Sequence, residues 1–538
     1  MDLLLDVDVV VDICTGRQPH AEPFRDAVAS CLSRGGRVWL YAGSVQTLLY
    51  VTRSELADYY AAQGIFPSER QLLWRTRELL QEFTRDLQWL AALGREGVVF
   101  CAEDTEDEQL IRALDRFPSG TVRLLTRNAS LLNTCPLAIS AQDYLALSGR
   151  QPTIPFVDLQ GQQDILRPQL EEGLHRVLHH GQYILGPEVR ELEQALARYV
   201  GVKHAVGCSS GTDALLLALM AHDVGPGDAV FTTPFTFIAS AEVISLLGAV
   251  PVFVDIDPGT YNLDPTRLDI AVQALRENNG LRHPLPRNCR DLRLRGVIAV
   301  DLYGLPADYD ALKEVCTAYG LFLVEDAAQS FGAEYKGRKA GSLADAGATS
   351  FFPAKPLGCY GDAGMVFTDR DDVAEICRSL LAHGKGLNKY ENVRIGMNAR
   401  LDTLQAAILL AKFQAFPHEV EARQQVAGRY AEELRSYESL IALPAVPEGC
   451  RPAWAQYTVR AKDAETRRLL VDRLSAAGIP TAIYYPRPLH LQTAFADLGY
   501  RPGDFPVSEL ASQTVFSLPF GPYLRKEDQK AVAAAMKE

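Results

Sequence analysis

The sequence predicts an α/β protein of two parts, with a small N-terminal α/β domain followed by a larger one built on a mostly parallel sheet. Three observations predict this class. The chain has 538 residues, too many for one hydrophobic core. From about residue 205, continuous apolar runs of strand length alternate with helical patterns, as expected for strands covered on both faces. The sequence SGRQPTIP, around Leu147–Pro155, interrupts these patterns and marks a domain boundary.

The first part, residues 1–148, contains the elements of a small α/β unit. Strands are expected at Leu3–Cys14, Arg37–Tyr41, Val98–Cys101 and Thr121–Thr126. Helices are expected at Pro23–Ser33, Arg70–Ala92 and Glu106–Asp115.

The second part begins with two helical segments, Ile165–His179 and Glu188–Val200. Strands are then expected at Ala205–Cys208, Ala229–Thr232, Val250–Val254, Gly296–Val300, Phe322–Val324, Ala348–Phe352 and Met365–Thr368. The clearest helices among them are Thr212–Ala221 and Leu401–Phe413. From about Pro444, the strand Tyr457–Ala461, the helix Thr466–Ala477 and the strand Thr481–Tyr485 predict an α+β unit. We therefore expect a large domain over 153–415 and a small C-terminal domain over 416–538.

Composition and charge restrict the class of protein. A hydrophobic fraction of 47% and a charged fraction of 22% are ordinary for a globular protein. The net charge of -13 argues against broad binding to RNA or anionic membranes. No apolar run reaches membrane-spanning length, and the start lacks the basic region of a signal peptide, so a cytoplasmic location is expected. Cys208, Cys316, Cys359 and Cys377 lie in apolar or glycine-rich stretches and are expected to be buried, reduced thiols.

A phosphate site is predicted where the strand ending at Cys208 leads into a helix. Ser210, Gly211 and Thr212 open that helix, and free backbone N–H groups beside small hydroxyl side chains suit a phosphate. Taken alone, the same residues are also those of a plain helix N-cap.

Two further strand ends carry ionisable residues. Asp326 ends an apolar strand, where α/β sheets bind ligands, and could pair with a protonated pyridine nitrogen. Lys355 follows the next strand, where burial would make its amine able to form a Schiff base; Ser350 before it could bind phosphate. Considered singly, Asp326 could also be a helix-capping residue and Lys355 a solvated loop residue. Together with Phe237, whose ring could stack on a cofactor, they predict a site for pyridoxal phosphate.

Five longer segments carry a family resemblance. They are Gln182–Glu188, Ser210–Ala214, Glu325–Ser330, Ser350–Gly358 and Gly396–Asp402. In this order they resemble the DegT/DnrJ/EryC1/StrS sugar aminotransferases, fold-type I enzymes that use pyridoxal 5′-phosphate, over essentially all of 153–538. The resemblance implies a homodimer with its active site at the subunit interface.

The resemblance also implies a role for each matching residue. Lys355 forms the Schiff base with the cofactor and later moves the proton between the substrate carbon and the cofactor. Asp326 holds the pyridine nitrogen, Gln329 contacts the phenolic oxygen, and Phe237 stacks on the ring. The phosphate is bound by Ser210, Gly211, Thr212 and Ser350, joined by Asn398 of the other subunit. Because Lys355 is present, the dehydratase chemistry of relatives with His at this position is excluded.

Within the family, the sequence is most similar to aminotransferases of bacterial surface-polysaccharide pathways. These convert UDP-2-acetamido-2-deoxy-3-oxo-glucuronate to its 3-amino sugar, with glutamate as donor. Arg400 and Tyr485 match the positions expected to meet the sugar carboxylate, and a guanidinium binds planar oxyanions through two hydrogen bonds. Tyr484 stands where this subgroup has His, so a 4-keto-6-deoxy sugar nucleotide or an inosose is an alternative substrate. The loop Arg276–Arg295 is longer than usual and is expected to be a surface insertion rather than a substrate contact.

The first part resembles a PIN domain, a metal-dependent ribonuclease fold, over about residues 1–147. Asp6 and Asp107 match two of its metal-binding acids, with Asp8 nearby, which implies a site for Mg²⁺ or Mn²⁺. Gln46–Thr47 and Ala129–Leu131 stand where further acids are expected. We interpret the domain as PIN-like but degenerate on ligand count. The alternative is a working ribonuclease that uses the aminotransferase part as a dimerisation scaffold.

Overall fold

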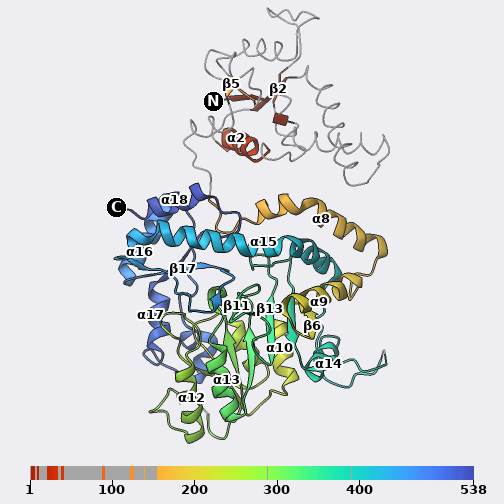
Figure 1. The fold of residues 1–538 in the computed structure, drawn as a ribbon, viewed down its shortest axis with the longest axis vertical. Helices are drawn as coiled ribbons and strands as arrows, with labels where there is room; N and C mark the ends of the chain where they lie inside the picture. Colours follow the sequence, from red (N-terminus) through yellow and green to blue (C-terminus); the bar gives the residue numbers. More distant parts are fainter. Residues whose placement is uncertain are drawn as a thin grey trace, which may run out of the picture. The chain divides into compact units, whose positions relative to one another are not determined.

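The computed structural model divides the chain into two compact units, residues 1–153 and 154–538, which we describe separately (Figure 1). The structure describes residues 2–5, 9–10, 21–33, 38–41, 88–90, 122–126, 138–139, 154–287, 289–388 and 390–537.

The first unit contains a parallel sheet with strand order β3-β2-β1-β4-β5. Its elements are β1 (Asp2–Leu5), α2 (Ala21–Ser33), β2 (Val38–Tyr41), β3 (Gln88–Leu90), β4 (Val122–Leu125) and β5 (Ala138–Ile139). Leu3, Leu5, Leu124 and Leu125 are buried, as expected for central strands of such a sheet. The described part of this unit is therefore α/β.

Two expectations for the first unit are wrong. The strand expected at Leu3–Cys14 ends at Leu5, where its pairing with β2 and β4 ends, and the buried Val9 and Val10 are helical. Residues 88–90, expected within a helix, pair with β2, because strand pairing overrides the local helical pattern. The rest of that helix and the elements expected at 98–101 and 106–115 lie outside the described residues.

The second unit is built on a seven-stranded sheet with the order β6-β14-β13-β10-β9-β7-β8. Its strands are β6 (His204–Cys208), β7 (Asp228–Thr232), β8 (Val250–Phe253), β9 (Arg293–Val300), β10 (Phe322–Asp326), β13 (Ala346–Ser350) and β14 (Gly364–Thr368). Only β14 runs antiparallel to its neighbours in this sheet, so the sheet is mixed but mostly parallel. The carboxyl ends of β10 and β13 therefore lie side by side.

Helices cover both faces of this sheet (Figure 1). One face packs on α10 (Gly211–Ala221), α11 (Ala239–Leu246) and α14 (Asp371–Leu380). The other packs on α12 (Pro265–Glu277), α13 (Tyr309–Tyr319), α9 (Pro187–Val200), α8 (Leu159–His180) and α15 (Thr403–Glu433). Neighbouring residues of β10 point to opposite faces of the sheet. Val324 packs on the side of α10, and Leu323 packs on the side of α12.

The small domain follows the long helix α15. It contains the antiparallel sheet β15-β17-β18, with β15 (Ile441–Ala442), β17 (Tyr457–Ala461) and β18 (Val515–Leu518), and the helices α16 (Ala464–Ala476), α17 (Pro506–Thr514) and α18 (Lys526–Ala535). The short strands β11 (Glu334–Tyr335), β12 (Arg338–Lys339) and β16 (Cys450–Arg451) form a third sheet across the two domains. Phe416 of α15 packs in the large-domain core and Tyr430 in the small-domain core.

Two expected elements of this unit differ from the structure. The helix expected at Leu401–Phe413 continues to Glu433 despite Pro417, because the residues around it pack into a core on each side. The boundary expected at 415 thus falls inside α15. The strand expected at Thr481–Tyr485 is wrong: Ala482 makes a single bridge to Ser517, and the rest of the segment is irregular.

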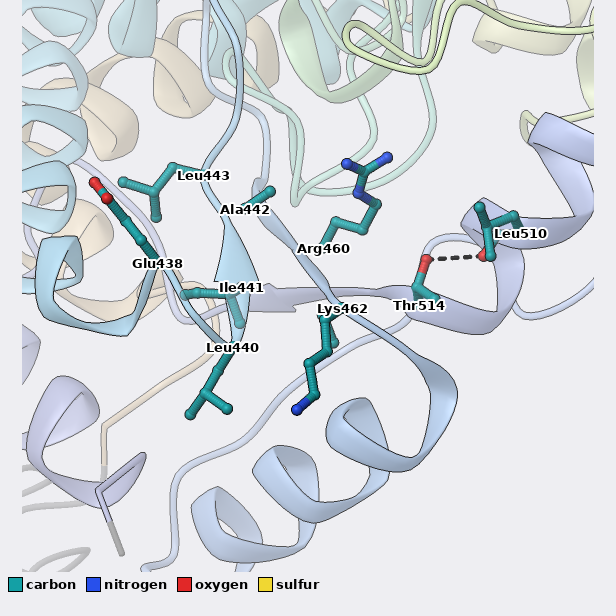
Figure 2. A pocket seen from close by; sticks show the side chains of 10 residues that line it. Glu438, Leu440, Ile441, Ala442, Leu443, Arg460, Lys462, Leu510 and Thr514 are labelled. Carbon is teal, nitrogen blue, oxygen red and sulfur yellow. Dashed lines mark hydrogen bonds between the residues drawn. The ribbon is translucent and has the colours of Figure 1, made fainter.

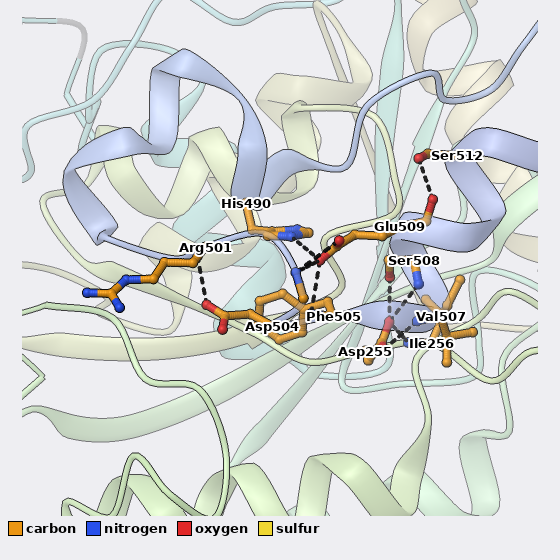
Figure 3. Close-up of polar contacts among 11 residues, drawn as sticks. Asp255, Ile256, His490, Arg501, Asp504, Phe505, Val507, Ser508, Glu509 and Ser512 are labelled. Atoms are coloured by element: carbon orange, nitrogen blue, oxygen red, sulfur yellow. Dashed lines mark hydrogen bonds and ion pairs between the residues drawn. The ribbon is translucent and has the colours of Figure 1, made fainter.

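A buried carboxylate fastens the small domain to the large one (Figure 3). Asp255, just after β8, accepts hydrogen bonds from the backbone N–H of Val507 at 3.0 Å and of Ser508 at 2.9 Å, and from the Ser508 hydroxyl at 2.6 Å. Beside it, Glu509 Oε1 lies 3.1 Å from Nε2 of the buried His490. These contacts hold the start of α17 against the sheet edge.

The cysteine expectation agrees with the structure, since Cys208, Cys316, Cys359 and Cys377 are free and buried. Across the described residues, no helix combines the length and apolar character that crossing a membrane requires.

Candidate active site

Asp326 is the last residue of β10 and is buried at the carboxyl edge of the sheet. Its Oδ2 accepts a hydrogen bond from Ser240 Oγ at 2.7 Å, and its Oδ1 accepts one from the backbone N–H of Ala328 at 3.2 Å. Burial raises the pKa of Asp326, whereas both hydrogen bonds and the positive charge of Lys355 lower it. Burial is the largest effect, so the pKa of Asp326 stays above its ordinary value, and the two hydrogen bonds and Lys355 offset part of the rise.

Lys355 lies in the loop after the neighbouring strand β13. Gly358 allows the tight turn, because a Cβ at this position would lie 2.5 Å from the carbonyl oxygen of Pro353. The Lys355 side chain is half-buried; burial lowers the pKa of its amine, and the charge of Asp326 opposes this. Lys355 and Asp326 are thus close enough to affect each other's ionisation. A lowered pKa increases the fraction of neutral, nucleophilic amine.

The third predicted group lies at the start of α10. The hydroxyl of Ser210 accepts from the backbone N–H of Asp213 at 3.0 Å, which caps the helix. Gly211 faces Ser350, and a Cβ at 211 would lie 2.6 Å from the Ser350 Cβ. Thr212 follows with a half-buried side chain. The structure therefore brings Ser350 to the open, N–H-bearing end of a helix, where an anion is stabilised.

Gln329, Tyr485 and Phe237 form one group. Gln329 accepts from the backbone N–H of Tyr303 at 2.7 Å and donates to the Tyr485 hydroxyl at 3.3 Å. The rings of Tyr485 and Phe237 are 6.4 Å apart, and Phe237 is 54% exposed, so an aromatic face is open to a ligand. Burial raises the pKa of Tyr485, and the negative charge of Asp326 acts in the same direction. Tyr485 therefore lies near Asp326.

Asn398 and Arg400 form a second pair of polar side chains. Both Nε and Nη2 of Arg400 donate to Oδ1 of the exposed Asn398, at 3.0 and 2.6 Å. The backbone of Arg400 bridges to Cys208, two residues before Ser210. Of the described carboxylates, none lies within 4.0 Å of this guanidinium. The Arg400 guanidinium is therefore hydrogen-bonded to the neutral amide of Asn398.

Sequence reasoning missed two residues of the site. Ser240 lies in the segment that supplies Phe237, but a Ser near a helix start gives no sign of its partner 86 residues away. Tyr303 has a φ of 60°, uncommon for a non-glycine residue, and its hydroxyl donates to the carbonyl oxygen of Tyr484. The segment that carries Tyr484 and Tyr485 is thus attached to Tyr303.

The predicted metal ligands Asp6 and Asp107, and the nearby Asp8, lie outside the described residues. Within the described part of the chain, no three His, Cys, Asp or Glu side chains gather as a metal site would require.

The loop expected at Arg276–Arg295 is shorter in the structure, because α12 continues to Glu277 and β9 begins at Arg293. The connection between them contacts the small domain. The backbone N–H of Arg287 donates to the carbonyl oxygen of Leu498 at 2.7 Å, and the buried His283 lies 2.8 Å from the carbonyl oxygen of Phe253. Both are contacts within the protein, and the interpretation of this segment as an insertion stays a prediction.

A cavity of about 640 Å³ lies on the small domain, lined by none of the site residues above (Figure 2). Its cations are Arg460 and Lys462, and Figure 2 shows their side chains pointing in opposite directions. They do not converge as the binding of one anion would require.

Comparison with known proteins decides the family. The DegT/DnrJ/EryC1/StrS aminotransferase family profile matches residues 165–537. The chain belongs to this family. As a DegT/DnrJ/EryC1/StrS protein it is a transaminase that depends on pyridoxal phosphate. The match begins after the first unit, so the PIN-like interpretation of that unit stays a prediction.

Two curated relatives of this aminotransferase cover most of its second unit. The UDP-2-acetamido-2-deoxy-3-oxo-D-glucuronate aminotransferase of Pseudomonas aeruginosa is 45% identical over 383 residues, 71% of this chain and 99% of the relative. The UDP-N-acetyl-3-dehydro-alpha-D-glucosamine 3-aminotransferase of Acidithiobacillus ferrooxidans is 38% identical over 384 residues, 71% of this chain and 97% of the relative.

Solved structures share the fold. A DegT/DnrJ/EryC1/StrS aminotransferase from Brucella abortus has a TM-score of 0.67 and 44% identity, covering 71% of this chain and 98% of its own. NtdA from Bacillus subtilis, with bound cofactor PMP, has a TM-score of 0.63 and 27% identity, covering 72% and 84%.

The residues of this aminotransferase fit the family's cofactor. The helix start at Gly211 is a cradle that a Cβ would fill, which suits the close approach of a phosphate. Asp326 provides a buried carboxylate for a ring nitrogen, and Lys355 provides an amine with a lowered pKa. The helix start at Gly211 would thus bind the phosphate, Asp326 would bind the ring nitrogen, and Lys355 would supply the amine for the aldehyde.

Proposed function

We propose that this aminotransferase transfers the amino group of glutamate to UDP-2-acetamido-2-deoxy-3-oxo-glucuronate and forms the 3-amino sugar for surface polysaccharide synthesis. The observation that carries the proposal is the shared site of Asp326 and Lys355 beside the helix start at Gly211. The Pseudomonas aeruginosa relative, aligned over 99% of its length, supports this substrate.

Pyridoxal phosphate, when bound, supplies an aldehyde carbon to the amine of Lys355 and a cationic ring that withdraws electrons from the reacting carbon. Asp326 holds the proton on the ring nitrogen, and Gln329 donates to the phenolic oxygen. The backbone N–H groups at the start of α10, with Ser210, Gly211, Thr212 and Ser350, bind the phosphate. Phe237 covers a face of the ring with its exposed side chain.

Lys355 moves the proton in this scheme. With the cofactor bound, its Nζ would take the proton from the substrate carbon and would transfer it to C4′. Burial lowers the pKa of Lys355, so more of the amine is neutral and able to accept a proton at neutral pH. Because the loop is closed by the turn at Gly358, the amine stays close to the edge where Asp326 lies.

Arg400 and Tyr485 bind the sugar carboxylate. The Arg400 guanidinium donates only to the neutral amide of Asn398 among its hydrogen bonds within the described residues, so a carboxylate would replace a weaker acceptor. Tyr485 is joined to the site by its hydrogen bond with Gln329, and the backbone of Arg400 bridges to Cys208, just before Ser210.

In the homodimer that we propose, Asn398 and Arg400 serve the site of the other subunit. The segment that leads to them carries exposed apolar side chains: Leu387, Tyr390, Val393 and Ile395 are 101%, 87%, 53% and 92% exposed. Such a concentration of exposed apolar side chains supports a contact with a second copy.

A second substrate is favoured by two observations. Tyr484 occupies the position of the His expected for the glucuronate subgroup, and the Acidithiobacillus ferrooxidans relative is named for a sugar with no carboxylate. A 3-oxo sugar without the carboxylate, or a 4-keto-6-deoxy sugar nucleotide, is therefore the alternative.

The test is to incubate the cofactor-loaded protein with glutamate and each of these three nucleotide sugars, and to measure amino sugar and 2-oxoglutarate by mass spectrometry. We expect the glucuronate derivative to be aminated fastest and Lys355→Ala to abolish turnover. Faster amination of a sugar without a carboxylate would contradict the proposed substrate. Failure of the loaded protein to aminate any of them would contradict the proposed reaction.

A further inference from the structure

Ser240 links two segments of the site that are far apart in the sequence. It is the second residue of α11, directly after the loop that carries Phe237, and its side chain is fully buried. Its hydroxyl lies 2.7 Å from Oδ2 of Asp326 and 3.1 Å from the hydroxyl of the buried Thr236. Three side chains thus form a row that ends at the carboxylate.

The direction of the hydrogen bonds in this row follows from simple chemistry. An ionised carboxylate only accepts, so Ser240 gives its single hydroxyl proton to Asp326. Ser240 can then only accept from Thr236, which makes Thr236 the donor. With Ala328 donating to Oδ1, each carboxylate oxygen of Asp326 has one fixed donor from the chain. The carboxylate is held in one orientation before any ligand binds.

Without such donors, burial would raise the pKa of Asp326 further and so move the carboxyl toward its neutral form. Burial raises the pKa of Asp326, and the Ser240 hydrogen bond is the largest effect that lowers it. A protonated Asp326 could not hold a second proton on a ring nitrogen, and the ring would lose its cationic character. The Ser240 hydroxyl therefore acts on the cofactor only through Asp326.

We propose that Ser240 is a positioning residue that keeps Asp326 ionised and oriented, so that the ring nitrogen of bound pyridoxal phosphate stays protonated. This inference rests on the proposed function, because it assigns the ring nitrogen to Asp326. Thr236 donates a hydrogen bond to Ser240 and so affects the ionisation of Asp326 less than Ser240 does.

The test uses full-length protein loaded with pyridoxal phosphate that is ¹⁵N-labelled in the ring. The ¹⁵N chemical shift reports protonation of the ring nitrogen and is recorded from pH 6 to 9. We expect a protonated ring in the wild type and in Ser240→Thr, which keeps the hydroxyl. In Ser240→Ala we expect a shift toward the unprotonated nitrogen, and a glutamate half-reaction slower by roughly ten- to hundredfold, the value of a hydrogen bond to a charged group.

Two further variants make the result specific. Thr236→Val should change the ¹⁵N shift in the same direction but less, and it serves if Ser240→Ala fails to fold. Ser512→Ala removes a buried hydroxyl on α17 that donates to a backbone carbonyl at 2.7 Å, and should leave the shift unchanged. Wild-type ring protonation in both Ser240→Ala and Thr236→Val would overturn the inference. A wild type that binds no cofactor would instead overturn the proposed function.

Discussion

Gly211 and Ser350 lie so close that a Cβ added to Gly211 would be 2.6 Å from the Cβ of Ser350 and 3.2 Å from its hydroxyl. The start of α10 and the end of β13 therefore form one narrow surface. Gly211→Ala should push Ser350 away or displace the helix start, and weaken the binding of pyridoxal phosphate. We expect the dissociation constant to rise at least about tenfold, as the loss of one hydrogen bond to a charged group implies. The dissociation constant is measured by titrating the protein with the cofactor and following the cofactor absorbance.

The control for this prediction is Gly428→Ala. Gly428 lies on the exposed side of α15, and a Cβ there would meet nothing within 4 Å. This variant should bind the cofactor normally and stabilise the protein by about 0.5–1 kcal/mol, the helix propensity difference between Gly and Ala. Equal cofactor affinity in both variants would contradict the proposed phosphate cradle.

Arg400→Gln tests the recognition of the sugar carboxylate. It should lower kcat/KM for the glucuronate substrate by about a hundredfold, because a charge-assisted hydrogen bond contributes about 3 kcal/mol. The kcat/KM for a 3-oxo sugar without the carboxylate should change much less. Competition between the two sugars, followed by mass spectrometry, gives the ratio of their kcat/KM values directly. Arg468→Gln, on the exposed face of α16, is the matched control. An equal loss for both sugars would argue that Arg400 acts on the fold or on another part of the substrate.

Asp301 should make stability depend on pH. It accepts hydrogen bonds from Tyr309 at 2.8 Å and Ser330 at 2.6 Å, and burial raises its pKa to about 7. In the unfolded chain an Asp titrates near 3.9. The folded state therefore binds a proton that the unfolded state releases, and the free energy of unfolding falls as pH rises between about 4 and 7. Thermal unfolding should give a lower Tm at pH 8 than at pH 5.5.

Asp301→Asn should reduce that difference in Tm, because the amide does not titrate. Asp472→Asn, an exposed residue of α16, should keep the dependence of the wild type. If Asp301→Asn and the wild type lose the same Tm between pH 5.5 and pH 8, the explanation is wrong.

Asp255 should control the attachment of α17. Asp255→Ala leaves the buried donors at Val507 and Ser508 without their acceptor and should destabilise the start of α17 by about 2 kcal/mol. Hydrogen exchange of peptides covering 506–514 should be faster, with α10 unchanged. Asp255→Asn keeps Oδ1, which serves Ser508, and should give an intermediate rate. Unchanged exchange in Asp255→Ala would show that α17 is held by other contacts.

Local features of the sequence were enough to place most of the second unit. Apolar runs predicted its seven large-domain strands to within a few residues, because strands covered on both faces contain few polar positions. Helix starts were predicted from cap residues such as Ser210, whose hydroxyl does cap α10. The segments with Asp326 and Lys355 were identified for the same reason, since Asp326 ends an apolar strand and Lys355 lies in the loop after the next one.

Predictions failed where a long-range partner outweighed the local pattern. Gln88–Leu90 has a helical pattern but pairs with β2. A strand was expected at 481–485, yet only Ala482 finds a backbone partner there. The helix expected to end at Phe413 continues to Glu433, because packing on both sides of Pro417 keeps α15 continuous.

By itself, the sequence determined the α/β class of the second unit, its order of elements and the residue types at each strand end, because periodicity and capping depend on near neighbours. Only the tertiary structure decided which of these residues meet. Ser240 reaches Asp326 across 86 residues, and Asp255 reaches Ser508 across 253. Such pairs are set by how helices pack on the sheet, and hydrogen-bonding groups buried by that packing must find partners wherever the chain brings them.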